Sequence, residues 1–258
     1  MSGTLERLGK RILNFHQTVG ELLKLLLQTV GFFREAPKNI PSILGQMAII
    51  GYETLPVAVV MAFFVGMVLA LQTGTELQKY GTQDIIGAIV GLSMVRELGP
   101  VMTSFLVAGR VGSAMAAEIG VMKVYEEIDA LKTLGINPVR YLAMPRLIAC
   151  LICVPALVVI ASSIGMLGGA LISHLHPKIF ISYSTYYESL RSALLFKEIG
   201  KGLVKSFVFG GIIGLVACYI GFKTTGGARG IGQSTTRAVV LSFMLILASD
   251  YFLTRVLM

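Results

Sequence analysis

Two oppositely charged neighbours, Arg96 and Glu97, lie inside an apolar stretch, residues 85–109, that carries no other charge. A charged side chain inside a membrane costs roughly 3 kcal/mol on insertion scales, so such residues usually face a cavity or a charged partner. Pro100 follows, and because proline has no N–H group it cannot donate a hydrogen bond to the carbonyl group of Arg96. The sequence therefore predicts a helix that bends at a charged pair.

The residues leave three interpretations of this pair open. Neighbours along a helix point about 100° apart, so Arg96 and Glu97 need not pair with each other. They can form structural ion pairs with other helices, or they can lie at the membrane–water interface. In the functional interpretation they make a polar spot in an apolar cavity, where Arg96 or Glu97 meets the head group of an amphiphilic molecule.

Residues 118–135 carry a second group of charges, arranged as in a short amphipathic helix. A helix that rests on an anionic membrane surface is expected to be basic, whereas Glu126, Glu127 and Asp129 are clustered here. The pattern therefore predicts a helix that fits a groove of another protein, ended by Gly135. Its polar residues are Glu118, Lys123, Glu126, Glu127, Asp129 and Lys132, and its apolar residues are Ile119, Met122, Tyr125, Ile128, Leu131 and Leu134.

No other arrangement in the sequence suggests catalysis or a cofactor. The chain has no Ser/His/Asp set and no G-x-x-x-x-G-K-[ST] motif, so we expect neither an enzyme nor an ATPase. Residues 226–232 are rich in glycine, but they lie between two apolar segments and are expected to form a flexible loop. Cys150 and Cys153 lie in an uncharged run, and His174 and His176 are badly spaced for one ion, so no metal site is expected.

The elements that position these residues are unusually apolar. Of the 258 residues, 55% are hydrophobic and only 14% are charged, and the mean hydropathy is +0.78. Because about a quarter of the residues in a soluble domain are charged, this composition excludes an ordinary soluble enzyme and a disordered chain. It predicts an all-α integral membrane protein, and the net charge of +8 is interpreted as a topology signal rather than as nucleic-acid binding.

Five segments are long and apolar enough to cross a bilayer, since a spanning helix needs about 20 residues. Residues 1–36 differ, because apolar and polar positions alternate there as in an amphipathic helix that lies along the membrane surface. A soluble helical arm is the alternative for that segment. Within a single domain, 1–258, the expected spans are 54–75, 85–110, 147–173, 203–222 and 236–257.

The distribution of basic residues predicts the orientation in the membrane. With the N-terminus in the cytoplasm, Lys and Arg residues near the span ends favour the cytoplasmic side by about two to one, which indicates an N-in, C-out topology. A chain with five spans is small for enclosing a pathway alone, so we expect a homodimer.

Residues 93–146 resemble the MlaE-type permease family, the membrane subunits of ABC-type phospholipid transport systems. Two positions depart from the family pattern, which commonly has Gln at Glu127 and a small hydroxyl residue at Tyr125. The matching stretches are Arg96-Glu-Leu-Gly-Pro100, Ala108-Gly-Arg-Val-Gly112, Ala117-Glu118, the run E-x3-M-x-V-x-E-x-I-D-A-L from Glu118 to Leu131, and Gly135, Pro138, Tyr141-Leu142 and Pro145-Arg146.

The resemblance implies the surroundings of the chain. It implies a homodimer in the inner membrane of a Gram-negative bacterium, with phospholipid held in a cavity between the protomers. ATP and Mg²⁺ belong to a partner ATPase subunit, to which helix 118–135 would couple. A periplasmic ring of MCE-domain subunits and a small cytoplasmic STAS-type subunit complete the assembly.

The resemblance also assigns roles to single residues. Arg96 and Glu97 would lie at the lipid cavity, and Leu77 and Tyr80, just before the second span, are added as lining residues; ordinary interfacial residues are the alternative for these two. The expected function is that of a permease subunit without catalytic activity, which moves phospholipids between the inner and outer membranes and maintains outer-membrane lipid asymmetry. A secondary transporter or channel that uses Arg96 and Glu97 as an ion or proton site is the alternative.

Overall fold

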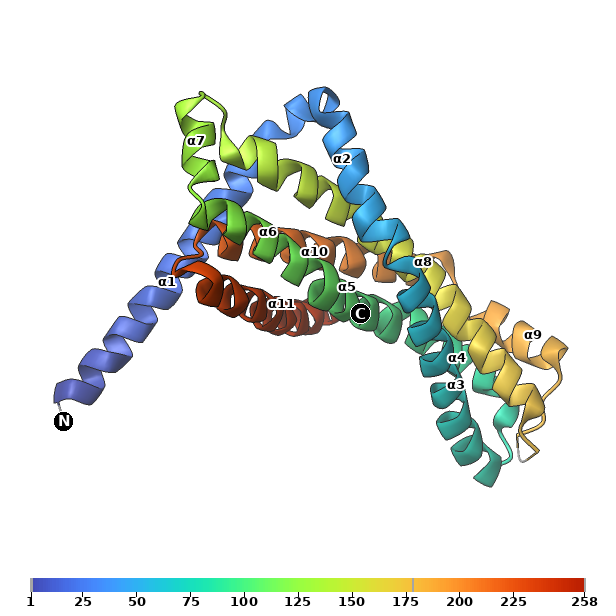
Figure 1. Cartoon of the computed structure of the whole chain (residues 1–258). Helices are drawn as coiled ribbons and strands as arrows, with labels where there is room; N and C mark the ends of the chain where they lie inside the picture. The colour runs from blue at the N-terminus through green and yellow to red at the C-terminus, as the bar shows by residue number, and fades with distance from the viewer. Residues whose placement is uncertain (1, 178, 258) are drawn as a thin grey trace.

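In the computed structural model, the backbone is described for residues 2–177 and 179–257, and the side chains are described from residue 17 onward within these ranges. Every regular element among them is helical, and no strand is found there (Figure 1). The all-α expectation is therefore confirmed. The α-helices are α1 (Ser2–Gly31), α2 (Ile40–Met47), α3 (Leu55–Lys79), α4 (Ile86–Ser93), α5 (Gly99–Val107), α6 (Ser113–Val124), α7 (Glu127–Thr133), α8 (Met144–Leu175), α9 (Tyr183–Ala193), α10 (Phe196–Phe222) and α11 (Gly227–Leu257).

Five helical stretches in the described part of the chain are long and apolar enough to cross a membrane, which agrees with the number expected. Short 3-10 or π turns divide several of these stretches, because successive helices continue with only a local change of hydrogen bonding. The stretches are Gln17–Lys79, Gln83–Val124, Val139–Leu175, Phe196–Phe222 and Gly227–Leu257.

The second stretch takes an irregular turn at the charged pair. Met94–Leu98 forms a π turn between α4 and α5, in which the N–H of Gly99 donates to the carbonyl oxygen of Met94. Pro100, at the start of α5, cannot supply the next regular hydrogen bond, so the wider turn satisfies the backbone locally. The helix is thus irregular at Arg96 and Glu97, and the irregularity is a π turn.

The single helix expected over residues 118–135 is wrong. The helix α6 ends at Val124, Glu126 takes a left-handed conformation with φ of 60°, and α7 begins at Glu127. Ile119 of α6 and Ile128 of α7 are buried in the same apolar cluster, so the apolar spacing continues across the break and conceals it. Gly135, with φ of 76°, follows the end of α7, as its position suggested.

The loop expected at residues 226–232 is also wrong, because α11 already begins at Gly227. The reversal between α10 and α11 is shorter, and Gly226 and Gly227 make it with φ values of 90° and 63°. The glycines of this segment therefore form a tight turn and the first turns of α11, rather than a mobile loop.

Close helix contacts hold the centre of the molecule together. A Cβ atom at Gly66 of α3 would lie 1.9 Å from the carbonyl oxygen of Gly165 of α8. One at Gly210 of α10 would lie 2.6 Å from the carbonyl oxygen of Cys150 of α8. Glycine thus lets α3 and α10 touch the backbone of α8. Cys150 and Cys153 are buried in this core as free thiols.

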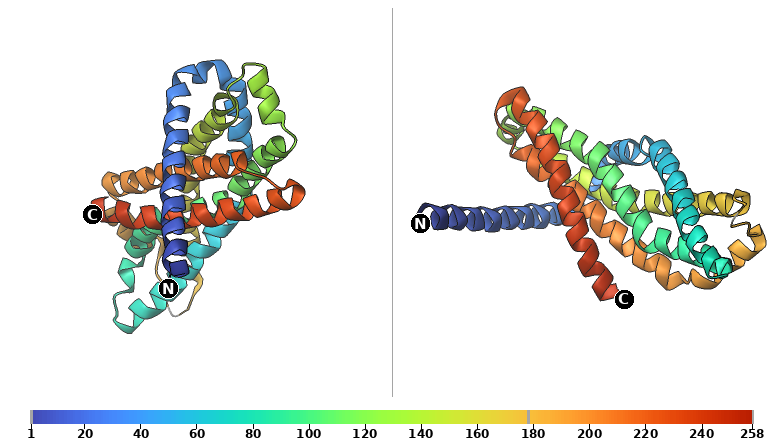
Figure 2. Two further views of the ribbon diagram at one scale, coloured as in Figure 1. Left: turned by 90° about the vertical axis from the view of Figure 1, so that its left-hand side faces the viewer. Right: turned by 90° about the horizontal axis from the view of Figure 1, so that it is seen from below.

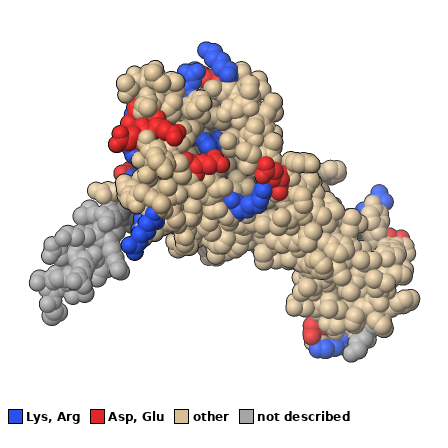
Figure 3. Space-filling model, in the orientation of Figure 1, with Lys and Arg blue, Asp and Glu red and all other residues tan. Residues whose placement is uncertain are grey.

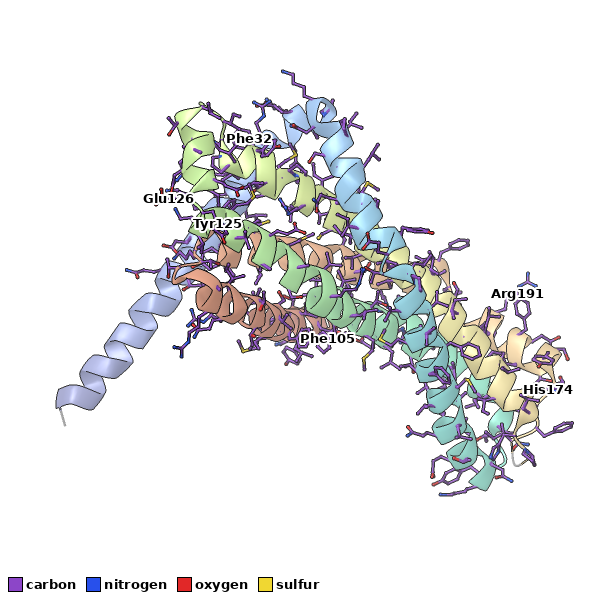
Figure 4. The ribbon with its side chains drawn as sticks, in the orientation of Figure 1. Phe32, Phe105, Tyr125, Glu126, His174 and Arg191 are labelled. Atoms are coloured by element: carbon purple, nitrogen blue, oxygen red, sulfur yellow. The ribbon has the colours of Figure 1, made fainter. Side chains whose placement is uncertain are left out.

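The molecule is elongated and has two distinct ends. The helix α7 lies at one end, and α9 lies at the other, beside the end of α3 where Lys79 is found (Figure 1). The helix α1 projects from the body and crosses α10 and α11 (Figure 2). In the side-chain view, Tyr125 and Glu126 lie at the α7 end, whereas His174 and Arg191 lie at the α9 end (Figure 4).

Candidate functional site

Arg96 and Glu97 each pair with α10 rather than with each other. The Nε atom of Arg96 donates to Oε2 of Glu198 at 2.5 Å, and Nζ of Lys201 lies 3.1 Å from Oε1 of the same carboxylate. The side chain of Glu198 is only 10% exposed, whereas that of Arg96 is 33% exposed. The arginine is therefore anchored on its buried side and reaches the surface on the other.

Lys205 is the centre of the second half of this cluster. Its ammonium group donates to Oε2 of Glu97 at 2.7 Å and to the hydroxyl of Thr254 at 2.7 Å, and it lies 2.9 Å from Oδ1 of Asp250. The lysine side chain is 3% exposed, that of Asp250 is 20% exposed and that of Glu97 is 39% exposed. Lys205 thus ties the π turn of the second stretch to α11.

Opposite charges in this cluster balance. Each of the cationic side chains Arg96, Lys201 and Lys205 has a carboxylate partner, and the cluster contains as many carboxylates as cations. Burial of a charge is tolerated only when a partner compensates for lost hydration, so loss of one member leaves an uncompensated charge. Arg96 and Glu97 therefore form structural ion pairs with another helix, which is one of the interpretations left open by the sequence.

The space beside the cluster is small. Arg96, Glu97, Lys201, Lys205, Thr254 and Leu257 line a cavity of about 20 Å³, which is room for about one water molecule. A phospholipid head group does not fit there within one protomer. Contact with a head group requires a space outside this cavity, on the partly exposed side of Arg96 and Glu97.

Leu77 and Tyr80 are not brought into this cavity. Leu77 packs against an apolar cluster that contains Ile86 and Met94, and Tyr80, just after α3, is 78% exposed. Neither residue is among those that line the cavity at Arg96.

Sequence reasoning missed the partners Glu198, Lys205 and Asp250. Lys205 and Asp250 fall inside the expected spans 203–222 and 236–257, whereas Glu198 lies just before the first of these. The signal that could have found these partners is charge complementarity between spans. A charged residue inside a membrane segment needs an opposite charge on another segment.

The acidic residues near α7 divide into paired and unpaired groups. Glu118 lies 2.8 Å from the guanidinium group of Arg146. Asp129 accepts from Lys132 at 2.7 Å and from Lys123 at 2.9 Å. These hydrogen bonds, with that of Lys132 foremost, lower the pKa of Asp129 from 3.8 to about 2. Asp129 therefore holds α6 and α7 together.

Glu126 and Glu127 make no hydrogen bond or ion pair with any side chain that the structure describes, and both are exposed. Tyr125, next to them in the chain, is 72% exposed, and Leu134, directly after α7, is 74% exposed, whereas Met122 packs inward against the cluster around Ile128. Acidic side chains gather over this end of the molecule (Figure 3), and Tyr125 and Glu126 lie at the junction of α6 and α7 (Figure 4). We call Tyr125, Glu126, Glu127 and Leu134 the acidic turn surface.

Among the residues that the structure describes, no group of three or more His, Cys, Asp or Glu side chains is placed to hold a metal ion.

The only group of opposite charges that joins three helical stretches in these parts of the chain is the cluster around Lys205.

Comparisons with known proteins identify relatives over nearly the whole chain. The sequence profile of the family described as Permease MlaE matches residues 43–256. A probable ABC transporter permease protein of Rickettsia typhi is 41% identical over 249 residues, which cover 96% of this chain and 95% of the relative. The permease protein MlaE of the intermembrane phospholipid transport system of Haemophilus influenzae is 32% identical over 253 residues, which cover 98% and 97%. A probable ABC transporter permease of a Synechocystis strain is 43% identical over 220 residues, which cover 84% and 81%.

These matches extend far beyond residues 93–146, on which the resemblance was based, and they include the cluster around Lys205 and the acidic turn surface. The chain belongs to the MlaE permease family of ABC transporter permeases.

Proposed function

We propose that the chain is the membrane subunit of an ABC transporter that moves phospholipids between the inner and outer membranes and so maintains outer-membrane lipid asymmetry. The observation that carries this proposal is the pair Arg96 and Glu97, held by the buried residues Glu198 and Lys205 of α10 and partly exposed at the edge of an apolar body. The Haemophilus influenzae relative, a permease of an intermembrane phospholipid transport system, supports the substrate class. The subunit has no catalytic role, and ATP with Mg²⁺ is used by a partner chain.

The lipid head group contacts the exposed side of the charged cluster. Arg96 attracts the phosphate group, and the neighbouring carboxylate of Glu97 limits how tightly it is held, because two negative charges repel each other. The cavity within one protomer is too small, so a second copy of the chain completes the space. Leu77 and Tyr80 line the part of that space nearest the α9 end.

The helix α11 supports a homodimer. Only 11% of its most apolar window is buried, less than in any other spanning stretch of the described chain. Leu247, Tyr251 and Phe252, toward the end of α11, are each more than half exposed. A second protomer that covers part of this face would enclose the exposed sides of Arg96 and Glu97 with apolar walls.

The acidic turn surface couples the permease to an ATPase subunit. Glu126 and Glu127 have no partner among the described side chains, and Tyr125 offers an exposed apolar anchor. Glu118, Met122 and Asp129 hold the turn in position. Glu118 pairs with Arg146, Met122 packs in the apolar cluster, and Asp129 accepts from Lys132. The stretch Gln83–Val124 carries the charged pair and ends directly before Tyr125, so movement at the ATPase reaches Arg96 along α6 and α5, which are joined by the π turn Ala108–Gly112.

The chain lies in the inner membrane of a Gram-negative bacterium with its N-terminus in the cytoplasm and its C-terminus outside. The amphipathic segment 1–36 rests on the cytoplasmic surface; the side chains of Arg7, Lys10 and Arg11, which support this topology, lie outside the described residues. The periplasmic ring of MCE-domain subunits then contacts the α9 end, and a STAS-type subunit joins on the cytoplasmic side with the ATPase.

Mass spectrometry of what purifies with the tagged chain tests this function. We expect an ATP-binding subunit and phospholipid with the wild-type chain, and loss of the ATP-binding subunit from Tyr125→Arg, which places a cation at the centre of the acidic turn surface. Tyr52→Arg is the matched control, because Tyr52 is 79% exposed and lies outside that surface. Purification without any ATP-binding subunit, together with full activity of Tyr125→Arg, would instead favour a secondary transporter.

A further inference from the structure

A polar pocket is lined by α1, α10 and α11, far along α11 from the charged cluster. The helix α1 crosses the other two helices (Figure 2). Its volume is about 420 Å³. Arg237 and Asp250 are separated by about 20 Å along α11, since a helix rises about 1.5 Å per residue. The pocket is lined by Gln17, Thr18 and Glu21 of α1, by Tyr219, Ile220 and Lys223 of α10, and by Ser234, Arg237 and Leu241 of α11.

The pocket carries an excess of positive charge. Glu21 accepts a hydrogen bond from the hydroxyl of Tyr219 at 2.8 Å and a second one from the ammonium group of Lys223. Lys223 also lies over the ring of Tyr219, 5.1 Å from its centroid. Arg237 is exposed and makes no ion pair or hydrogen bond within the described part of the chain. Among the described lining residues, the carboxylate of Glu21 is outnumbered by the two cations Lys223 and Arg237, and Arg237 has no partner there.

An apolar groove continues directly from this pocket. It has a volume of about 370 Å³, and it shares Ile220, Arg237 and Leu241 with the polar pocket. Val240 and Met244, which line it further along α11, are 49% and 56% exposed. From Arg237 to Met244 the groove follows α11 for about 10 Å. Arg237 thus stands at the border between a cationic pocket and an apolar channel.

We propose that this composite site binds an anionic phospholipid of the leaflet nearest to α1. The phosphate group contacts Arg237 and Lys223, and one acyl chain occupies the groove along Val240, Leu241 and Met244. A soluble anion would use only the pocket and a neutral apolar molecule only the groove, whereas a phospholipid of net negative charge matches both. The assignment rests on the proposed membrane topology, in which α11 crosses the bilayer, but not on Arg96 or Glu97.

A bound lipid at this position links the amphipathic helix to the spanning helices. Lys223 is shared between Glu21 and the incoming phosphate, so lipid binding loosens the hold of α10 on Glu21 while the acyl chain fixes α11. The site lies about 20 Å along α11 from the charged cluster, so it is a lipid contact separate from that cluster.

Photo-crosslinking tests the site. The purified full complex is incubated with phosphatidylglycerol that carries a diazirine in one acyl chain, and the labelled peptides are mapped by mass spectrometry. We expect label at residues 240–244. In Arg237→Ala the concentration for half-maximal labelling should rise about tenfold, as for loss of one charge-assisted hydrogen bond. Met244→Trp should abolish labelling there by filling the groove.

Arg229→Ala is the matched control, because Arg229 lies in the first turn of α11 and does not line the pocket; it should label like the wild type. Unchanged labelling in both Arg237→Ala and Met244→Trp would overturn the proposal, as would equal competition by glycerol phosphate, which would show a site for a free anion. The variant Glu97→Lys separates this site from transport: it should lose lipid transport and keep the label, so failure of either assignment is recognised independently.

Discussion

Lys205 is the residue whose loss should disturb the charged cluster most. Its side chain is 3% exposed, and it is the common partner of Glu97 and Asp250. Replacing it with Met keeps the apolar stem but leaves two carboxylates next to each other without a cation. Removal of one partner from a buried ion pair costs about 3–5 kcal/mol. Because Glu97 is 39% exposed and water partly compensates it, we expect the lower end of that range, about 3 kcal/mol.

The unfolding temperature of the purified chain in detergent measures this loss. For a chain of this size a destabilisation of about 3 kcal/mol lowers the midpoint by about 6 °C or more. The double variant Lys205→Met/Asp250→Asn should recover part of the loss, because it removes one of the two carboxylates that would otherwise lack a cation. Lys79→Met is the control, since Lys79 and Glu76 are both 64% exposed and such a pair contributes little.

Two results would refute this reasoning. One is an unfolding temperature of Lys205→Met that matches that of Lys79→Met, because the lysine would then not compensate buried charge. The other is a double variant less stable than Lys205→Met, because Asp250 would then stabilise the fold by a contact other than Lys205.

Two further predictions concern the acidic end and the helix core. The lowered pKa of Asp129 means that its ion pairs stabilise the fold fully above the unfolded value of 3.8 and lose this effect as the pH falls through about 2. The difference in unfolding temperature between the wild type and Asp129→Asn should therefore be constant at neutral pH and shrink below pH 3.8; a difference that persists at pH 2 would contradict this. Gly66→Ala should destabilise the chain by about 3 kcal/mol, because its Cβ would meet a carbonyl oxygen at 1.9 Å. Gly45→Ala, where nothing lies within 4 Å, should be neutral, and equal unfolding temperatures of the two variants would contradict direct backbone contact.

The helical fold could be predicted from the sequence because apolar runs of sufficient length have few alternatives in a membrane. The distortion at Arg96 could be predicted as well, since Pro100 removes a specific hydrogen bond. The break at Glu126 could not, because Ile119 and Ile128 keep one apolar spacing while the backbone between them turns. The short turn at Gly226 and Gly227 was missed for a related reason: glycine permits both a mobile loop and a tight reversal.

The candidate site was predictable only in part. Arg96 and Glu97 stood out because they lie in the middle of an apolar stretch. Nothing local indicates that Arg96 pairs with Glu198, or that Glu97 shares Lys205 with Asp250. Pairing between helices depends on how the spans rotate against each other, and that is set by contacts such as Gly66 against Gly165. The small size of the cavity at Arg96 likewise follows from packing and not from residue type.

The central claim is that the charged cluster serves ATP-driven lipid transport. The most direct measurement is transfer of fluorescent phospholipid out of proteoliposomes that contain the purified complex, with and without ATP. Glu97→Lys should abolish the ATP-dependent transfer while the assembly stays intact, because it puts a cation where a carboxylate holds Lys205. Glu76→Lys, the same reversal at an exposed position, should transfer lipid like the wild type. Normal transfer by an assembled Glu97→Lys complex would contradict the account.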